Sequence, residues 1–144
     1  MSLLNLRKVT YEDCYLLFKW INDEAVRKNS FNSENIDIQE HKLWLKKKLQ
    51  EENTKLYIIL KDDCDVGVIR IEKNQEEYII SYSIAREFRG QKIGKQILIY
   101  IKEFMKGKKL VGLVKHDNIA SIKAFEGAGY KKIIEKEYIK FVSI

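Results

Sequence analysis

One segment constrains the fold of this chain more than any other: a strand-like run, a basic glycine turn and a helix-like run in direct succession. Residues 78–84 are rich in β-branched and aromatic side chains, and the turn at residues 89–95 follows them closely. Beyond the turn, apolar residues recur at helical spacing and no glycine occurs until Gly107. This succession is typical of an α/β domain.

The turn has the chemistry of an anion site. The first turn of a helix carries backbone N–H groups without intrahelical partners, equivalent to about half a positive charge. Glycine allows an anion to approach these groups closely. Arg89, Lys92 and Lys95 add three cations. We therefore expect a ligand with a pyrophosphate group at this turn.

Length and composition predict one domain over residues 1–144, because the chain has 144 residues of which 45% are apolar. No apolar run reaches the ~20 residues that span a bilayer, so no membrane partner is expected. Cys14 and Cys64, without a secretion signal, predict free buried thiols and a cytoplasmic location. The net charge of +6 comes mostly from scattered lysines, so no specific nucleic-acid partner is expected.

The hydrophobic periodicities predict the element order β-α-α-β-β-β-α-β-α-β-β. This order gives a mixed, largely antiparallel seven-stranded sheet flanked by about four helices. The first helix starts at Thr10, with an apolar face that consists of Tyr11, Cys14, Tyr15, Phe18 and Ile21. Residues 22–36 are polar and irregular and predict no element. The second helix starts near Asp37, and the last two cover residues 91–105 and 117–129.

Two motifs at a matching separation resemble those of the GCN5-related N-acetyltransferase superfamily. The family's turn, Arg/Gln-x-x-Gly-x-Gly/Ala, is similar to residues 89–94, with Lys92 at the first glycine position. Its second motif, Asn-x-x-Ser/Ala-x-x-x-Tyr-x-x-x-Gly-Phe, is similar to residues 118–130, with Phe125 at the tyrosine position. The resemblance covers the whole chain in element order, but specific residues only between about 78 and 131.

The resemblance implies acetyl-coenzyme A as co-substrate, with its pyrophosphate on the turn and its pantetheine arm along a strand that splays from its neighbour. The alternative for that strand is plain pairing in a sheet, and the alternative for Asn118 is a helix cap. No metal is expected, because His41 and His116 share no ligand spacing with the cysteines. The implied coenzyme-binding residues are Tyr82, Ser83, Ile84, Arg89, Gly90, Gln91, Lys92, Ile93, Gly94, Lys95, Asn118, Ser121 and Phe125.

Catalysis would require a proton acceptor for the attacking amine and a proton donor for the departing thiolate. In the family a tyrosine hydroxyl serves as the donor, and Phe125 cannot. Either Tyr82 replaces it, or water does, or the chain binds the coenzyme with poor catalysis. His41 is the candidate acceptor, with Ser83 able only to relay a proton through water; the alternative for His41 is packing beside Trp44.

The amine acceptor is indicated by a weaker resemblance. Trp20-x-Asn22 and His41 are similar to a branch that acetylates nucleotide-linked 4-amino-4,6-dideoxy sugars for surface polysaccharides. A nucleobase could stack on Trp44, Phe31 or Tyr15, although Tyr15 is expected in the core. The alternatives are a protein α-amine, an aminoglycoside-like polyamine, or a non-catalytic coenzyme A-binding module. The expected partner is therefore a small-molecule amine, and the expected assembly is a monomer or a homodimer.

Overall fold

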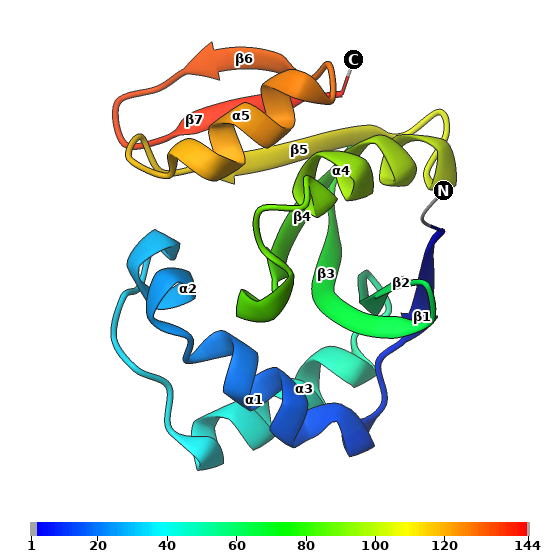
Figure 1. Cartoon of the computed structure of the whole chain (residues 1–144), viewed down its shortest axis with the longest axis vertical. Helices are drawn as coiled ribbons and strands as arrows, with labels where there is room; N and C mark the ends of the chain where they lie inside the picture. Colours follow the sequence, from blue (N-terminus) through cyan, green and yellow to red (C-terminus); the bar gives the residue numbers. More distant parts are fainter. Residues whose placement is uncertain (1–2, 144) are drawn as a thin grey trace.

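A computed structural model describes residues 3–143, which form a seven-stranded mixed sheet and five α-helices. The strands are β1 (Leu4–Lys8), β2 (Thr54–Lys61), β3 (Cys64–Asn74), β4 (Glu77–Ile84), β5 (Lys109–Val114), β6 (Lys131–Ile134) and β7 (Ile139–Val142). The helices are α1 (Cys14–Ile21), α2 (Glu24–Asn29), α3 (Ile38–Gln50), α4 (Ile93–Phe104) and α5 (Ile119–Gly127). Figure 1 shows their arrangement along the chain.

The sheet has the order β1-β2-β3-β4-β5-β7-β6, and its pairings are antiparallel except for the parallel pair β4–β5. Asp62 and Asp63 both have positive φ and form the tight turn between β2 and β3. The expected mixed, largely antiparallel sheet of seven strands is confirmed.

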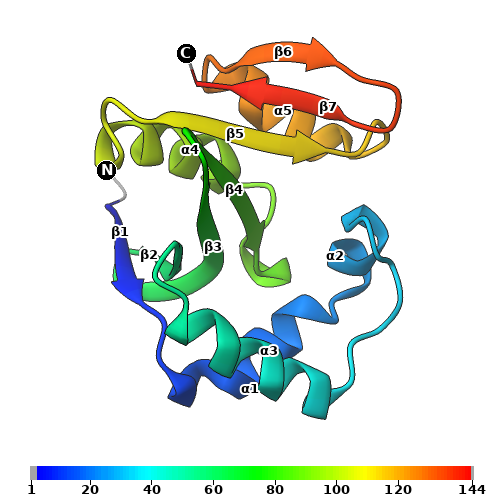
Figure 2. The same ribbon diagram turned by 180° about the vertical axis from the view of Figure 1, so that it is seen from behind.

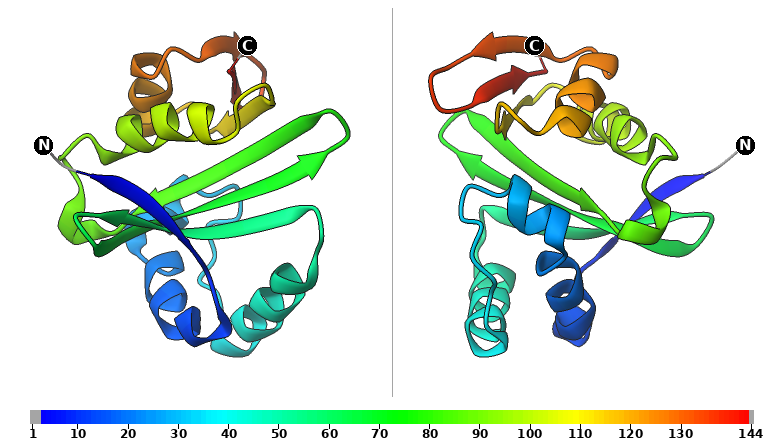
Figure 3. Two further views of the ribbon diagram at one scale, coloured as in Figure 1. Left: turned by 90° about the vertical axis from the view of Figure 1, so that its right-hand side faces the viewer. Right: turned by 60° about the vertical axis from the view of Figure 1, so that its left-hand side comes forward.

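Helices cover both faces of the sheet. In Figure 3, α4 and α5 lie on one face, and α1 and α3 lie on the other. The α4 side holds the larger core, which includes Ile97, Leu98 and Ile101. The other core combines α1 and α3 residues such as Leu17 and Leu45 with the opposite face of the sheet. The active-site candidates lie where these two layers meet the middle of the sheet.

The prediction for residues 22–36 is wrong, because the segment contains α2, and the structure has five helices instead of about four. The side chain of Asp23 caps α2 by accepting hydrogen bonds from the N–H groups of Ala25 (3.1 Å) and Val26 (3.3 Å). A helix of fewer than two turns is too short to show a helical period in its apolar residues.

The predicted apolar face of the first helix is also partly wrong. Its buried residues are Cys14, Leu17 and Trp20, whereas Tyr11 and Tyr15 are exposed. The ring of Tyr15 lies 5.6 Å from the ammonium group of Lys42 on α3, and Tyr11 has the same relation to Lys46. Tyrosine can occupy such a place because its ring packs against a lysine while its hydroxyl stays in water.

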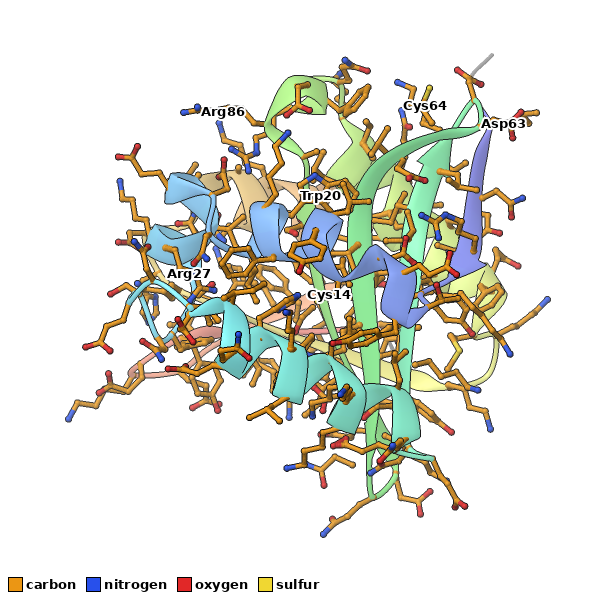
Figure 4. All side chains as sticks on the ribbon, turned by 90° about the horizontal axis from the view of Figure 1, so that it is seen from below. Cys14, Trp20, Arg27, Asp63, Cys64 and Arg86 are labelled. Atoms are coloured by element: carbon orange, nitrogen blue, oxygen red, sulfur yellow. The ribbon has the colours of Figure 1, made fainter. Side chains whose placement is uncertain are left out.

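The thiols of Cys14 and Cys64 are free, as expected, but only Cys14 is buried. Cys64 begins β3 beside the exposed turn at Asp63, at the other side of Figure 4 from Arg27. Within residues 3–143, no helix has the length and apolar character needed to span a membrane.

The feature that positions the site is an opening in the middle of the sheet. Strands β4 and β5 pair only through Glu77–Ile79 and Lys109–Val111. Beyond this point β4 continues to Ile84 and β5 to Val114, and the two strands diverge (Figure 1). Among the described strands, the β5-facing side of residues 80–84 therefore has no partner. This agrees with the splayed strand that the resemblance implies, and it differs from the alternative in which β4 pairs along its whole length.

Candidate active site

Two cavities meet at the opening between β4 and β5. The first, which we name the turn cavity, has a volume of about 600 Å³ and lies between α2, the 88–95 turn and the start of α5. The second, the helix cavity, has a volume of about 450 Å³ and lies between the sheet and α1–α3. Both are lined by Val26, Asn29, Ser30, Tyr82, Ser83, Asn118 and Ser121. The two cavities are therefore adjacent and share one wall.

The turn carries a row of free hydrogen-bond donors, most of them at residues that line the turn cavity. Within the described residues, the backbone N–H groups of 91–95 donate to no protein acceptor. Residues 92–95 line the cavity, whereas Gln91 does not, and its side chain accepts a hydrogen bond from Lys61 (3.0 Å). Gly90 has φ of 81°, and Lys92, which precedes the first residue of α4, has φ of 62°. Lysine thus adopts a left-handed conformation that favours glycine, at a cost of about 1–2 kcal/mol. The turn conformation that the expected anion site requires is therefore compatible with a lysine at this position.

Gly94 allows β4 and α4 to approach each other. A Cβ atom added at Gly94 would lie 3.2 Å from the hydroxyl oxygen of Tyr82. That hydroxyl lies 3.2 Å from the Oγ atom of Ser121 on α5. Burial raises the pKa of Tyr82, although the contact with Ser121 opposes this, so the phenol keeps its proton at neutral pH. A protonated hydroxyl pair therefore lies where the two cavities join.

Arg89 is engaged by protein groups. Its Nε donates to the carbonyl of Ile84 (3.0 Å), and its Nη2 donates to the carboxylate of Asp23 (2.8 Å). Arg89 lines the turn cavity, and its guanidinium is directed toward Asp23 at the start of α2. Lys92 and Lys95, which also line this cavity, have no ion-pair partner among the described residues.

The residues of the second motif lie on α5 and beside it. The side chain of Asn118 accepts a hydrogen bond from the N–H of Ser121 (3.3 Å), so it caps α5, and it also lines both cavities. Phe125 is buried and stacks on Phe141, with 4.8 Å between ring centroids. A Cβ atom added at Gly112 would lie 2.3 Å from the Cζ atom of Phe125. The ring therefore points its para position at β5, and Phe125 contributes packing to the site.

His41 is 1% exposed and lines the helix cavity. Its Nε2 lies 3.0 Å from the carbonyl oxygen of Cys14, which can only accept, so the proton resides on Nε2. Nδ1 is then an acceptor, and it is buried without a hydrogen-bond partner among residues 3–143. Burial lowers the pKa of His41 below its ordinary value of 6.5, although the bond to Cys14 opposes this. The ring is also packed beside Trp44, with 5.9 Å between centroids, so the packing alternative holds together with the free lone pair.

The helix cavity is cationic. Arg27 and Arg70 line it, and among its described lining residues there is no aspartate or glutamate. Arg27 is buried and donates to the carbonyls of Ile21, Asn32 and Glu34 and to the hydroxyl of Ser30. These partners carry no charge, so the cation is not neutralised by an ion pair.

Arg70 lies over the ring of Trp44, with 5.6 Å from its guanidinium carbon to the ring centroid. Its Nε is 2.7 Å from a carboxylate oxygen of Glu72, close enough for an ion pair. The geometry does not align the N–H, so Nε has no hydrogen-bond partner. His41 and Arg70 thus already pack against the ring of Trp44. The ring of Phe31, which is exposed at the cavity wall, is freer for stacking with a ligand.

Sequence reasoning missed Asp23, Arg27 and Arg70 as site residues. The pair Asp23-Glu24 is a helix-start signal that could have found α2. Arg27 and Arg70 carry no local signal, since their importance comes from burial and from the lack of acidic neighbours. The Trp20-x-Asn22 motif has a structural role: Asn22 exchanges two hydrogen bonds with the backbone of Ile36 (2.7 and 2.8 Å) and so fixes the loop of the cavity wall.

The chain belongs to the GNAT acetyltransferase family, whose domain model, described as an acetyltransferase (GNAT) domain, matches residues 4–131. It is similar to acetyltransferase PseH of Campylobacter jejuni, with 27% identity over 130 residues, which cover 88% of this chain and 82% of that protein.

Solved structures share the fold at lower identity. Spermidine N-acetyltransferase from Vibrio cholerae, in complex with CoA and spermine, has a TM-score of 0.82 and 13% identity, over 96% of this chain and 93% of that one. The aminoglycoside acetyltransferase AAC(6')-Ib, in complex with paromomycin and acetyl-CoA, has a TM-score of 0.79 and 15% identity, over 95% and 92% of the two chains. The protein is thus an acetyltransferase of the GNAT fold. Among its described residues, no group of three or more His, Cys, Asp and Glu side chains is placed to hold a metal.

Proposed function

We propose that this protein transfers the acetyl group of acetyl-coenzyme A to a primary amine of a nucleotide-linked amino sugar. The observation that carries the choice of acceptor is the charge of the helix cavity, which has two arginines and no carboxylate among its described lining residues. Arg70 forms an ion pair with Glu72, which lies outside the lining, so the cation of Arg27 is the one without an ion-pair partner among the described residues. A polyamine or an aminoglycoside carries several positive charges, and such a cavity would repel them. An acceptor with phosphate groups and one amine suits the cavity better.

The turn cavity fits the coenzyme on three grounds. The free N–H groups of residues 91–95 suit a pyrophosphate, and the cations of Lys92 and Lys95 lie beside them. The unpaired side of β4 at residues 80–84 offers backbone groups to the amides of the pantetheine arm, which would bind like an added strand. The cavity continues into the helix cavity at Tyr82 and Ser83, where thioester and amine would meet.

In the proposed reaction the amine nitrogen attacks the thioester carbonyl, the carbon–sulfur bond breaks, and the nitrogen loses a proton. Among the residues that line the helix cavity, His41 offers a neutral lone pair, on Nδ1, at neutral pH. The bond from Nε2 to Cys14 fixes this tautomer. We therefore assign His41 as the proton acceptor. It takes the proton directly, or by a relay through Ser83 and a water molecule.

The thiolate of the departing coenzyme also needs a proton. Phe125 cannot supply it, and its ring faces β5. The hydroxyl of Tyr82, with Ser121 beside it, is the donor that both cavities share. A coenzyme thiolate is a tolerable leaving group, since a thiol has a pKa of about 8.5, so a hydroxyl of raised pKa need only hydrogen-bond to the sulfur in the transition state.

A thermal-shift screen tests the proposal. Nucleotide sugars with a free amine, matched nucleotides without the sugar, spermidine and kanamycin are each added with and without coenzyme A. We expect coenzyme A and the aminosugar nucleotide each to raise the unfolding temperature, because a ligand that binds only the folded state stabilises it. Stabilisation by spermidine or kanamycin, and none by any nucleotide, would favour the polyamine acceptor that the two structural relatives bind.

A further inference from the structure

Helix α2 connects the two halves of the split sheet. At its N-terminus, the carboxylate of Asp23 accepts a hydrogen bond from Nη2 of Arg89. Nε of Arg89 donates to the carbonyl of Ile84, at the end of β4. Near its C-terminus, the carbonyl of Lys28 accepts from Nζ of Lys115, the residue that follows β5, at 2.9 Å. Figures 1 and 2 show α2 at the open end of the split, near the ends of both diverging strands. We name these two contacts, with α2 between them, the α2 clasp.

The same helix is a wall that both cavities share. Val26, Asn29 and the following Ser30 line the turn cavity and the helix cavity alike. Its position therefore sets the width of both. The helix has six residues and would not be stable alone, so its position depends on its tertiary contacts. These are the contacts at its two ends and the hydrogen bonds of Arg27 to the segments before and after it.

The contact between Asp23 and Arg89 is supported by further hydrogen bonds to the same carboxylate. One oxygen of Asp23, Oδ2, accepts from Arg89 at 2.8 Å and from the N–H groups of Ala25 and Val26. Burial acts to raise the pKa of Asp23, but Arg89 and the two N–H donors outweigh it and lower the pKa. The carboxylate is therefore ionised at neutral pH and holds a charge-assisted hydrogen bond.

We propose that Asp23 is a positioning residue that couples the coenzyme turn to the acceptor wall, so that coenzyme binding fixes α2 and thereby shapes the helix cavity. Arg89 belongs to the turn on which the pyrophosphate would bind, and Asp23 caps α2, so a constraint on the turn is passed to α2 through the contact between these two side chains. Any direct contact of the coenzyme with Ala25, Val26 or Asn29 would remain in Asp23→Asn, so the variant isolates the part that Asp23 transmits. The inference rests on the proposed function, because it takes coenzyme A as the ligand of the turn cavity.

The test uses coenzyme A alone and does not depend on the acceptor. Amide hydrogen exchange of residues 24–30 is measured in the full-length protein with and without saturating coenzyme A, and calorimetry establishes saturation for each variant. In the wild-type protein we expect coenzyme A to slow this exchange at least about threefold, since local opening of α2 becomes rarer. In Asp23→Asn we expect less than about half of that slowing, because asparagine still caps the helix but offers no charge to Arg89.

Two further variants separate coupling from stability. Lys115→Met removes the contact with the carbonyl of Lys28 at the other end of the α2 clasp, and we expect it also to reduce the slowing of exchange by coenzyme A. This variant is used in place of Asp23→Asn if Asp23→Asn does not fold. Glu126→Gln, which removes the exposed ion pair between Glu126 and Lys132 (3.2 Å) far from α2, is the matched control and should keep the full slowing. A merely structural role for Asp23 would speed exchange equally with and without the coenzyme.

The outcomes are distinct for the two claims. Coenzyme binding without any slowing of residues 24–30 in the wild-type protein overturns the coupling and leaves the proposed function intact. Full slowing in Asp23→Asn overturns it as well, and so does full slowing in Lys115→Met if Asp23→Asn does not fold. A wild-type protein that does not bind coenzyme A overturns the proposed function, and the coupling with it.

Discussion

At the scale of single residues, the site depends on side chains whose surroundings differ from their ordinary ones. Lys92 adopts a glycine conformation, Arg27 is a buried cation without a carboxylate, and His41 is a buried base with a free lone pair. Each of these costs stability. Such costs are typical of positions retained for binding or catalysis, although a buried histidine bonded to a backbone carbonyl also stabilises the contact of α1 with α3.

The lowered pKa of His41 predicts a specific dependence of stability on pH. The folded protein binds this proton more weakly than the unfolded chain, so the contribution of His41 is complete above its ordinary pKa of 6.5 and is lost as the pH falls below it. We expect His41→Gln, whose amide can still donate to Cys14, to lose less unfolding free energy between pH 6.5 and about pH 5 than the wild-type protein. Urea unfolding across this range measures it.

An equal loss of unfolding free energy with falling pH in His41→Gln and the wild-type protein would show that the pKa of His41 is the same in the folded and unfolded states. That result would contradict a neutral buried base at His41.

At the scale of elements, the strongly periodic parts were predictable. The strand, turn and helix around residues 78–105, the hairpin at Asp62-Asp63 and the start of α3 at Asp37 all carry local signals that the structure confirms. α2 was not predictable from its periodicity. The buried face of α1 was not fully predictable either, because Tyr11 and Tyr15 fit the apolar spacing but stay exposed beside lysines of α3. The cavities depend on contacts between distant residues, such as Asp23 with Arg89, that no local pattern encodes.

The turn before α4 makes a prediction at this scale. Because Lys92 has a positive φ, replacing it by glycine should relieve strain, whereas replacing it by alanine should remove only the charge. We expect the free energy of unfolding of Lys92→Gly to exceed that of Lys92→Ala by about 1 kcal/mol. Both variants should bind coenzyme A more weakly than the wild-type protein, by about twofold to fivefold, if the ammonium contacts the pyrophosphate.

Chemical denaturation and calorimetry measure these two quantities. Alanine at least as stable as glycine would contradict the left-handed conformation of residue 92. Unchanged coenzyme affinity in both variants would show that the backbone N–H groups bind the phosphates without help from this cation.

At the scale of the whole molecule, charge distribution separates the candidate acceptors. The protein has a net charge of +6, and the arginines of the helix cavity bring that excess to the place where the acceptor would bind. Proteins of the same fold act on different amines, as the names spermidine N-acetyltransferase and aminoglycoside acetyltransferase show. Because the fold is shared, the acceptor must be inferred from the cavity and its charges.

The most direct test of the central claim is the rate of free thiol release from acetyl-coenzyme A with different amines. We expect a nucleotide-linked 4-amino-4,6-dideoxy sugar to give a kcat/KM at least about 100-fold above that of spermidine or kanamycin, a difference of about 2.7 kcal/mol in transition-state binding. An equal or higher value for spermidine or kanamycin would contradict the anionic acceptor. No thiol release with any amine, alongside coenzyme A binding, would contradict catalysis by this chain altogether.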